Sequence, residues 1–202
     1  MNRIETIDQI IKDRMREDRS QFHAYYEDYW AAQKAYLRLA GLAALVKTGP
    51  VVEIGTDSAC GALVMAAACS PHVPVVSFDV REWCVDLGKS KAKRYDIGNA
   101  QFIQGDVSKV EEIVGAHPIE LAYVDGAHDT ESCLADLETL APLMSGTIGL
   151  IAVDDYYQPI DEIGKNHTVT RGVEIFLSKN PEWTAVLLQT GFILIGRKER
   201  AP

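Results

Sequence analysis

The sequence predicts an α/β fold in which seven mostly parallel strands form one doubly wound sheet. From residue 51 onward, short and uniformly apolar runs alternate with helical segments, which is typical of a parallel sheet covered on both faces. The last two apolar runs are separated only by Thr190 and Gly191, and this spacing predicts a C-terminal antiparallel hairpin. Residues 1–48 lack such runs and have a helical pattern, so we expect an N-terminal helical extension.

The remaining residues, 49–202, are expected to form a single domain. Its predicted strands are Val51–Ile54, Val75–Phe78, Gln101–Gln104, Glu120–Val124, Thr147–Val153, Thr184–Gln189 and Phe192–Gly196. Its predicted helices are Ala59–Ala68, Glu82–Tyr95, Val107–Val114, Thr130–Leu143 and Val169–Lys179. Parallel strands separated by helices bind their ligands beyond the carboxyl ends of the strands, so that is where functional residues are expected.

The extension has two parts, an isoleucine-containing helix and an aromatic-rich stretch from Phe22 to Tyr36, and Gly49 with Pro50 ends it. Three roles are open for these helices. They could form a lid, they could form the interface of a homodimer or a higher homo-oligomer, or their apolar stripe could simply be buried in the core.

Composition excludes several classes of partner. The chain has 202 residues, 20 basic against 29 acidic, and a net charge of −9. Without a basic stripe, neither a nucleic acid nor an anionic membrane surface is an expected partner. The longest apolar tract is far shorter than the ~20 residues of a membrane span, and no basic and apolar leader opens the chain. The four cysteines form no CxxC pair, which favours reduced thiols and a cytoplasmic location.

Three predicted strands end in residues suited to a nucleoside-containing cofactor. Gly55 follows the first strand and would let the backbone approach a ligand closely. Asp79 follows the second strand, where a carboxylate can accept hydrogen bonds from ribose hydroxyls. Asp106 follows the third and could accept a hydrogen bond from an adenine amino group. The alternatives are a tight turn without a ligand at Gly55 and a helix N-cap at Asp106.

Acidic residues also follow the fourth and fifth predicted strands. Asp125 and His128 come after one, and Asp154 and Asp155 after the other. Three carboxylates at one rim repel each other unless a cation holds them, and oxygen ligands favour Mg²⁺, with Mn²⁺ or Ca²⁺ as alternatives. These residues could instead cap a loop and a helix, or belong to a variant that uses no metal.

Taken together, these motifs resemble the class I S-adenosylmethionine-dependent methyltransferases, which have a Rossmann-like fold, over about residues 49–198. The resemblance departs in the first loop, where Ala59 replaces the second glycine of an ExGxxxG pattern and Gly61 lies two residues further on. It implies that S-adenosylmethionine is bound by Glu53, Gly55, Ser58, Asp79 and Asp106.

The DGxH segment and the later Asp-Asp pair resemble the metal-dependent O-methyltransferases of the sugar and natural-product type. This resemblance implies that Asp125, Asp154 and Asp155 bind the metal, with Mg²⁺ as the expected ion. It also implies that His128 is the general base beside Asp125, and that the methyl acceptor is the hydroxyl of a small molecule. Tyr156–Thr170 follows the Asp-Asp pair and is expected to contact this acceptor.

Three other functions compete with this interpretation. A metal-independent methyltransferase of the same fold would keep the carboxylates for other reasons. A non-catalytic S-adenosylmethionine-binding protein would have the same cofactor loop. A nicotinamide-dependent oxidoreductase is disfavoured, because the sequence has neither GxGxxG after the first strand nor a suitably placed TyrxxxLys pair.

Overall fold

A computed structural model describes residues 2–21, 26–146, 149–156, 168–189 and 191–198, and at residues 18–21, 26–33 and 189 it describes the backbone alone. Most of the predicted acceptor segment and most of the N-terminal aromatic side chains therefore lie outside the described residues. None of the described helices is both long enough and apolar enough to cross a membrane.

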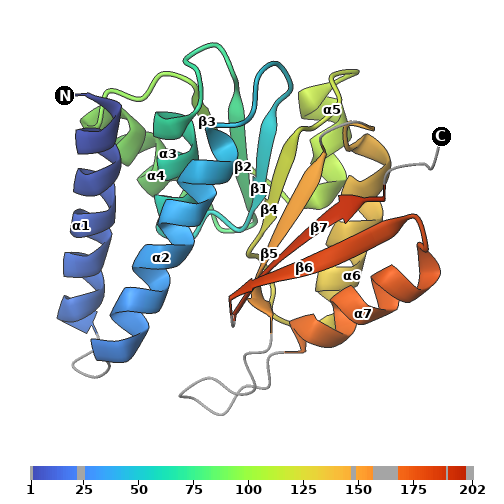
Figure 1. Ribbon diagram of the computed structural model, residues 1–202. Helices are drawn as coiled ribbons and strands as arrows, with labels where there is room; N and C mark the ends of the chain where they lie inside the picture. Colours follow the sequence, from blue (N-terminus) through green and yellow to red (C-terminus); the bar gives the residue numbers. More distant parts are fainter. Residues whose placement is uncertain (1, 22–25, 147–148, 157–167, 190, 199–202) are drawn as a thin grey trace.

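Seven strands form one sheet in the order β3-β2-β1-β4-β5-β7-β6, which confirms the predicted fold class (Figure 1). β1 pairs in parallel with β2 and β4, and only β7 runs antiparallel to its two neighbours, β5 and β6. The strands are β1 (Val51–Ile54), β2 (Val75–Asp79), β3 (Ala100–Gln104), β4 (Leu121–Val124), β5 (Leu150–Tyr156), β6 (Trp183–Gln189) and β7 (Gly191–Arg197).

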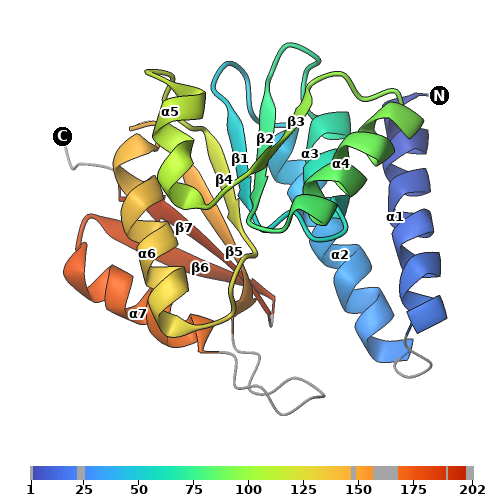
Figure 2. The same ribbon diagram turned by 180° about the vertical axis from the view of Figure 1, so that it is seen from behind.

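Helices cover both faces of this sheet, as Figures 1 and 2 show from opposite sides. The helices on one face are α1 (Arg3–Gln21), α2 (Tyr26–Ala43), α3 (Cys60–Ala68) and α4 (Glu82–Arg94). Those on the other face are α5 (Val110–Val114), α6 (Thr130–Leu140) and α7 (Val169–Lys179), with short 3₁₀ turns at Val107–Lys109 and Ala141–Leu143. Each face buries its own apolar cluster, because strands covered on both sides have apolar residues in both directions.

The N-terminal extension packs into the core of the domain. Ile10, Ile11 and Met15 of α1 and Leu39 of α2 are all nearly inaccessible and belong to the same apolar cluster as α3. Ile10 and Ile11 thus lie on the buried face of α1, whereas Ile4 near the start of the helix is exposed. In the part of the chain with described side chains, the extension is therefore continuous with one face of the sheet.

One prediction about the strands was wrong at a position that matters for the site. The fifth strand was expected to end at Val153, but β5 continues to Tyr156 and includes Asp154 and Asp155. Its pairing with β7 shifts register between Asp154 and Tyr156, which makes a β-bulge at Asp155. Asp155 has a φ of 57°, a left-handed conformation that Asp adopts more readily than most residues. Two acidic residues in a row obscured the strand because Asp has a low strand propensity.

Glu120, just before β4, connects the end of the extension to the sheet through hydrogen bonds. Its carboxylate accepts hydrogen bonds from the backbone N–H groups of Lys47, Thr48 and Gly49 and from the Thr48 hydroxyl, at 2.7–3.2 Å. Burial alone would raise the pKa of Glu120, but these hydrogen bonds outweigh it and the pKa is lowered. The charged form of Glu120 therefore stabilises the junction between the extension and the sheet.

We expect Glu120→Gln to destabilise the protein by about 1–3 kcal/mol at pH 7, because an amide keeps only one of the two acceptor oxygens, turns an NH₂ donor toward the remaining N–H group and lacks the charge that strengthens these hydrogen bonds. Since the folded state lowers the pKa, the stabilisation is present above the unfolded pKa of about 4.3 and is lost as pH falls through the folded value. Urea unfolding at pH 7 and at pH 3.5 measures this, with exposed Glu112→Gln as the control. An equal difference between wild type and variant at both pH values would contradict the prediction.

Candidate active site

The loop that follows β1 is pressed against the end of β4. Gly55 has a φ of +97°, and a Cβ at this position would lie 1.9 Å from the backbone oxygen of Asp125. The Asp125 N–H in turn donates to the Ile54 carbonyl at 2.8 Å. A glycine is required here for both its backbone conformation and its lack of a side chain. This contact brings the predicted cofactor loop and the predicted metal site to the same edge of the sheet.

Glu53 explains why the glycine pattern of this loop departs from ExGxxxG. Its Oε1 lies 2.1 Å from where a Cβ on Gly61 would be, so Gly61 leaves room for the carboxyl group. Ala59, at the place of the second glycine, has a left-handed φ of 63°. Ser77 donates to Glu53 Oε2 at 2.5 Å, and burial raises the pKa of Glu53 well above its usual value. Glu53 therefore ties β1 to β2 and to the beginning of α3.

Ser58, the remaining residue predicted in this loop, is buried. Its backbone oxygen accepts a hydrogen bond of 3.2 Å from Nζ of Lys91 on α4, and the same ammonium group pairs with Glu17 of α1 at 2.6 Å. The loop is thus held in place from the side of the N-terminal extension.

Asp79, the last residue of β2, is already bound by protein donors. The N–H groups of Asp57 and Arg81 donate to it, and the Arg81 guanidinium donates through Nε and Nη2 at 2.9 and 3.0 Å. Burial alone would raise the pKa of Asp79, but the hydrogen bonds from Arg81 and Asp57 lower it to about 2. A ribose bound here must share this carboxylate with Arg81 or displace the guanidinium, a feature that the sequence did not indicate.

Asp106 follows β3 and caps the 3₁₀ turn after it. Its Oδ1 accepts hydrogen bonds from the Ser108 N–H at 2.9 Å and from the Ser108 hydroxyl at 2.5 Å, which is the N-cap alternative named above. The same residue lines a cavity of about 410 Å³ with Asp79, Ile54 and Phe78. Capping and ligand contact are compatible, because a carboxylate has several acceptor positions.

Asp136 of α6 is a further residue that lines this cavity, and it is not among the site residues predicted above. It is 8% exposed, and it lines the cavity together with Ser132, one helical turn before it. Burial, followed by the charges of Asp106 and Asp129, raises the pKa of Asp136 to about 7. The sequence contained little signal for this pair, because α6 also contains other polar residues, such as Glu131 and Glu138, which are exposed.

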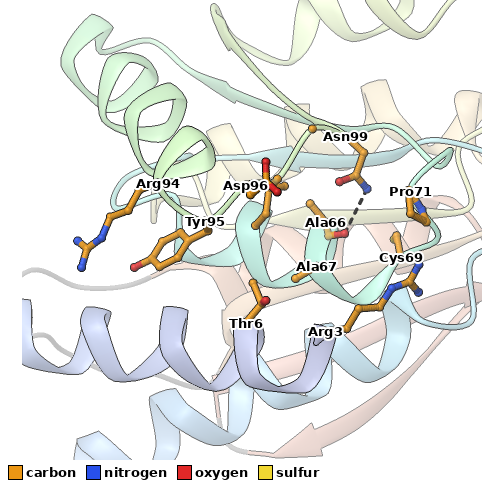
Figure 3. A pocket seen from close by; sticks show the side chains of 12 residues that line it. Arg3, Thr6, Ala66, Ala67, Cys69, Pro71, Arg94, Tyr95, Asp96 and Asn99 are labelled. Carbon is orange, nitrogen blue, oxygen red and sulfur yellow. Dashed lines mark hydrogen bonds between the residues drawn. The ribbon is translucent and has the colours of Figure 1, made fainter. Parts of the chain in front are cut away.

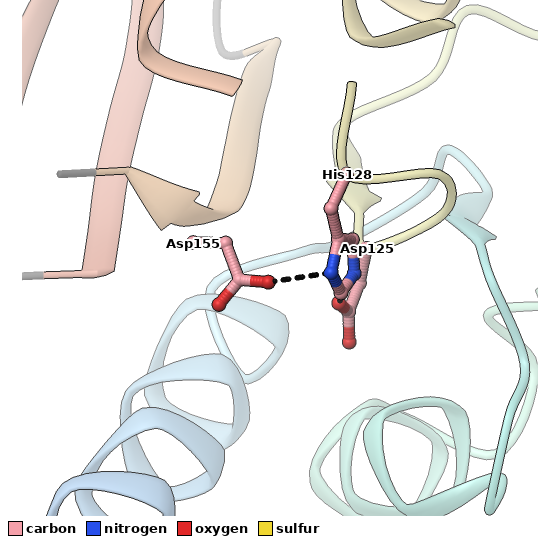
Figure 4. Close-up of side chains that lie close together, drawn as sticks. All are labelled: Asp125, His128 and Asp155. Atoms are coloured by element: carbon pink, nitrogen blue, oxygen red, sulfur yellow. Dashed lines mark ion pairs between the residues drawn. The ribbon is translucent and has the colours of Figure 1, made fainter. Parts of the chain in front are cut away.

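The acidic cluster forms where β4 and β5 end. Nδ1 of His128 lies 2.9 Å from Oδ2 of Asp155, and Nε2 lies 3.6 Å from Oδ1 of Asp125 (Figure 4). One ligand atom from each of these three residues lies within 4.8 Å of the others. Asp154 joins the cluster through Tyr123, whose hydroxyl lies 2.9 Å from Asp154 and 3.1 Å from Asp125.

The bulge in β5 accounts for the presence of two consecutive aspartates in this cluster. Side chains alternate between the two faces of a regular strand, so neighbours normally point apart. Asp154 and Asp155 nevertheless line the same cavity of about 380 Å³, together with Asp125 and His128. The left-handed backbone at Asp155 breaks the alternation and brings both carboxylates to one rim.

The electrostatics of the cluster are those of crowded carboxylates. Burial raises the pKa of Asp125, and burial together with the charge of Asp125 raises the pKa of Asp154 to about 8. The hydrogen bonds of His128 to Asp125 and Asp155 raise the pKa of its imidazole to about 10. The oxygen-rich donor set with one imidazole fits a hard divalent cation, which would supply the charge that the protein itself lacks here.

The N-terminal extension forms one wall of the cavity of about 380 Å³, a contribution that the sequence did not predict. Arg14 of α1 and Tyr36 of α2 line it together with the acidic cluster and the loop after β1. The periodicity of the extension indicated only a buried stripe, and nothing in the sequence showed where α1 and α2 would dock. The extension therefore supplies polar side chains to the candidate site.

A larger cavity, of about 440 Å³, lies away from these residues. Figure 3 shows Arg3 and Thr6 of α1 facing the end of α3 and the turn after α4. Cys69 and Asn99 line it, and they lie at the C-terminal end of α3 and just before β3, so the cavity opens near the amino ends of the strands. It is separate from the edge where the predicted site residues meet.

Residues 52–156 match the model of the family described as "Methyltransferase domain", which is just over half of the chain. The chain belongs to this family. The matched range begins in β1 and ends with Tyr156, so it contains every residue predicted to bind the cofactor or the metal or to act as the base, but only the first residue of the predicted acceptor segment.

Solved structures show the same fold for this methyltransferase. An O-methyltransferase from Bacillus cereus in complex with SAH has a TM-score of 0.71 at 17% identity, with 96% of this chain and 91% of that chain covered. The SAH-bound methyltransferase from Podospora anserina has 0.73 at 16%, with 94% and 88% covered. An rRNA methylase from Streptococcus thermophilus has 0.60 at 17%, with 81% and 93% covered. No curated protein matches the sequence significantly.

Proposed function

We propose that this methyltransferase uses S-adenosylmethionine to methylate a hydroxyl group of a small molecule, with the assistance of a divalent cation, Mg²⁺ being the expected one. The observation that carries the proposal is the convergence of Asp125, His128 and Asp155 within 4.8 Å, next to the loop at Gly55. A methyl donor bound at this loop and a hydroxyl held at the cluster would lie side by side.

The donor site would be formed by the residues at the ends of β1, β2 and β3. Asp79 and Asp106 line the cavity of about 410 Å³, which suits the ribose and the adenine. Glu53 and Ser58 line the cavity of about 380 Å³, which suits the methionine end. Gly55 lines both. The two SAH-bound methyltransferases of the same fold support S-adenosylmethionine as the donor.

Asp125, Asp154 and Asp155 would hold the cation, and His128 lies close enough to serve either as a further ligand or as the base. When bound, a divalent cation supplies the charge that lowers the pKa of an acceptor hydroxyl. With a pKa of about 10, His128 among bare carboxylates holds a proton at neutral pH and cannot accept another. Offsetting the carboxylate charges brings the imidazole toward its ordinary pKa of about 6.5, where it can take the hydroxyl proton.

A small-molecule acceptor is supported by the charge of the chain. The fold alone does not decide the acceptor, because the structurally similar proteins include an rRNA methylase. Binding of an RNA backbone depends on basic residues, whereas this chain has a net charge of −9. Five of the side chains that line the cavity of about 380 Å³ are carboxylates: Glu53, Asp57, Asp125, Asp154 and Asp155.

Calorimetry and a turnover assay test the proposal. We expect S-adenosylhomocysteine to bind with a micromolar dissociation constant and NAD⁺ not to bind; tight binding of NAD⁺ alone would overturn the proposed donor. Methyl transfer from S-adenosylmethionine to a panel of catechols, phenols and sugars should be lost in EDTA and restored by Mg²⁺. Full activity in EDTA would remove the cation from the mechanism.

A further inference from the structure

The N-terminal extension places a positive charge in the cavity that the proposed function gives to the methionine end of the donor. Arg14 lines this cavity with Ser58 and Gly61, and its side chain is 24% exposed. Its Nη2 lies 3.5 Å from Oδ2 of Asp57, whose own side chain is half exposed. A ligand carboxylate in this cavity would share the guanidinium with its partners in the protein.

A second arginine, Arg81, also lines this cavity. Arg81 holds Asp79 through two guanidinium hydrogen bonds, at the ribose end of the site. Of the two arginines, Arg14 is therefore the one near the beginning of α3. At the beginning of α3 the Glu53 carboxyl group lies against Gly61 and accepts a hydrogen bond from the Ala62 N–H, so this carboxyl group already serves the N-terminus of the helix.

Contacts on either side of Arg14 fix the position of α1. Asp13 accepts hydrogen bonds from Arg94 at 3.0 Å and from the Tyr95 hydroxyl at 2.8 Å, and its side chain is 7% exposed. Glu17 pairs with Lys91 at 2.6 Å. These contacts dock α1 on α4 and hold Arg14 over the loop, which reduces the entropy lost when it binds a ligand.

The methionine end of S-adenosylmethionine carries an ammonium and a carboxylate on one carbon atom. The cavity offers both kinds of partner, carboxylates such as that of Asp125 and the guanidinium of Arg14. We infer that Arg14 binds the carboxylate of the methyl donor, so that α1 is part of the cofactor site. The inference rests on the proposed function, and it goes beyond it by assigning a donor-binding role to the extension.

Two ligands that differ only at the amino-acid end provide the test. S-adenosylhomocysteine carries the carboxylate, whereas 5′-methylthioadenosine keeps the adenine, the ribose and the thioether but lacks it. We expect Arg14→Ala to weaken binding of S-adenosylhomocysteine at least tenfold in calorimetry, and to change binding of methylthioadenosine less than twofold. Arg14→Lys should recover part of the loss, because a lysine keeps the charge without the paired donors.

Arg16→Ala is the matched control, since Arg16 lies on the same helix with a side chain that is 72% exposed. It should leave both affinities unchanged, and thermal unfolding should show each variant folded. Unchanged binding of S-adenosylhomocysteine by Arg14→Ala, or an equal loss for both ligands, would overturn the inference and leave the proposed function standing. A loss seen only for a carboxylate-bearing acceptor would assign Arg14 to the acceptor instead. If the wild type binds neither ligand, the proposed function itself fails.

Discussion

Asp125→Asn is expected to lower the rate of methyl transfer by about 10³-fold or more, because it removes a carboxylate that is central to the cluster. Asp125 lies near His128 on one side and accepts a hydrogen bond from the Tyr123 hydroxyl on the other. An amide would bind a divalent cation more weakly and would no longer balance the charge of a protonated His128. Its backbone, which contacts Gly55, would stay in place.

The same variant should be at least as stable as the wild type in EDTA. Burial and the neighbouring carboxylates raise the pKa values of Asp125 and Asp154, so the charged forms oppose folding when no cation is bound. Because these pKa values are raised, stability is present at low pH and is lost as pH rises toward about 8. Replacing one carboxylate relieves part of this repulsion.

Thermal unfolding with and without Mg²⁺ separates the two effects. In wild type, Mg²⁺ should raise the Tm, as any ligand of the folded state does, and Asp125→Asn should abolish most of this rise. Asp86→Asn, at an exposed position of α4, should behave as the wild type. If Asp125→Asn keeps both full activity and the Mg²⁺-dependent rise in Tm, Asp125 is not a cation ligand.

Gly55→Ala should cost about 3 kcal/mol or more in the free energy of unfolding and should abolish binding of S-adenosylhomocysteine. A Cβ at residue 55 would overlap the backbone oxygen of Asp125 at 1.9 Å, and neither backbone can move without breaking the pairing of β1 with β4. The φ of +97° adds strain for any residue with a Cβ.

Gly41→Ala is the matched control for this prediction. Gly41 lies in α2 with nothing within 4 Å of its Cβ position, so alanine should stabilise the helix by about 0.5–1 kcal/mol. Chemical denaturation of the two variants therefore should give changes of opposite sign. A Gly55→Ala protein with wild-type stability would mean that the loop adopts another path than the one described.

Local signals in the sequence were sufficient for the order of elements and for part of the site. Apolar runs and turns predicted the parallel strands and the hairpin, because burial on both faces of a sheet imposes that pattern locally. The position of Gly55 and Asp79 at one edge of the sheet could be predicted, because loops at the carboxyl ends of parallel strands face one crevice. Asp125 and His128 followed from the same rule applied to β4.

Other features depend on contacts between residues far apart in the chain. The bulge at Asp155 depends on the register between β5 and β7, and it decides that Asp154 and Asp155 share a rim. The need for glycine at position 61 arises from the Glu53 carboxyl group, which folds against it from β1. No periodicity within a single element contains such information.

The sequence by itself determined the doubly wound α/β sheet, the N-terminal helical extension and the sheet edge where the predicted site residues gather, because hydrophobic periodicity and turn residues act locally. Only the tertiary structure decided that the Arg81 guanidinium donates hydrogen bonds to Asp79 and that α1 brings Arg14 over the loop at Gly55. Those arrangements arise from the docking of whole elements, and a charged side chain on a helix has the same sequence pattern whether it faces water or a ligand.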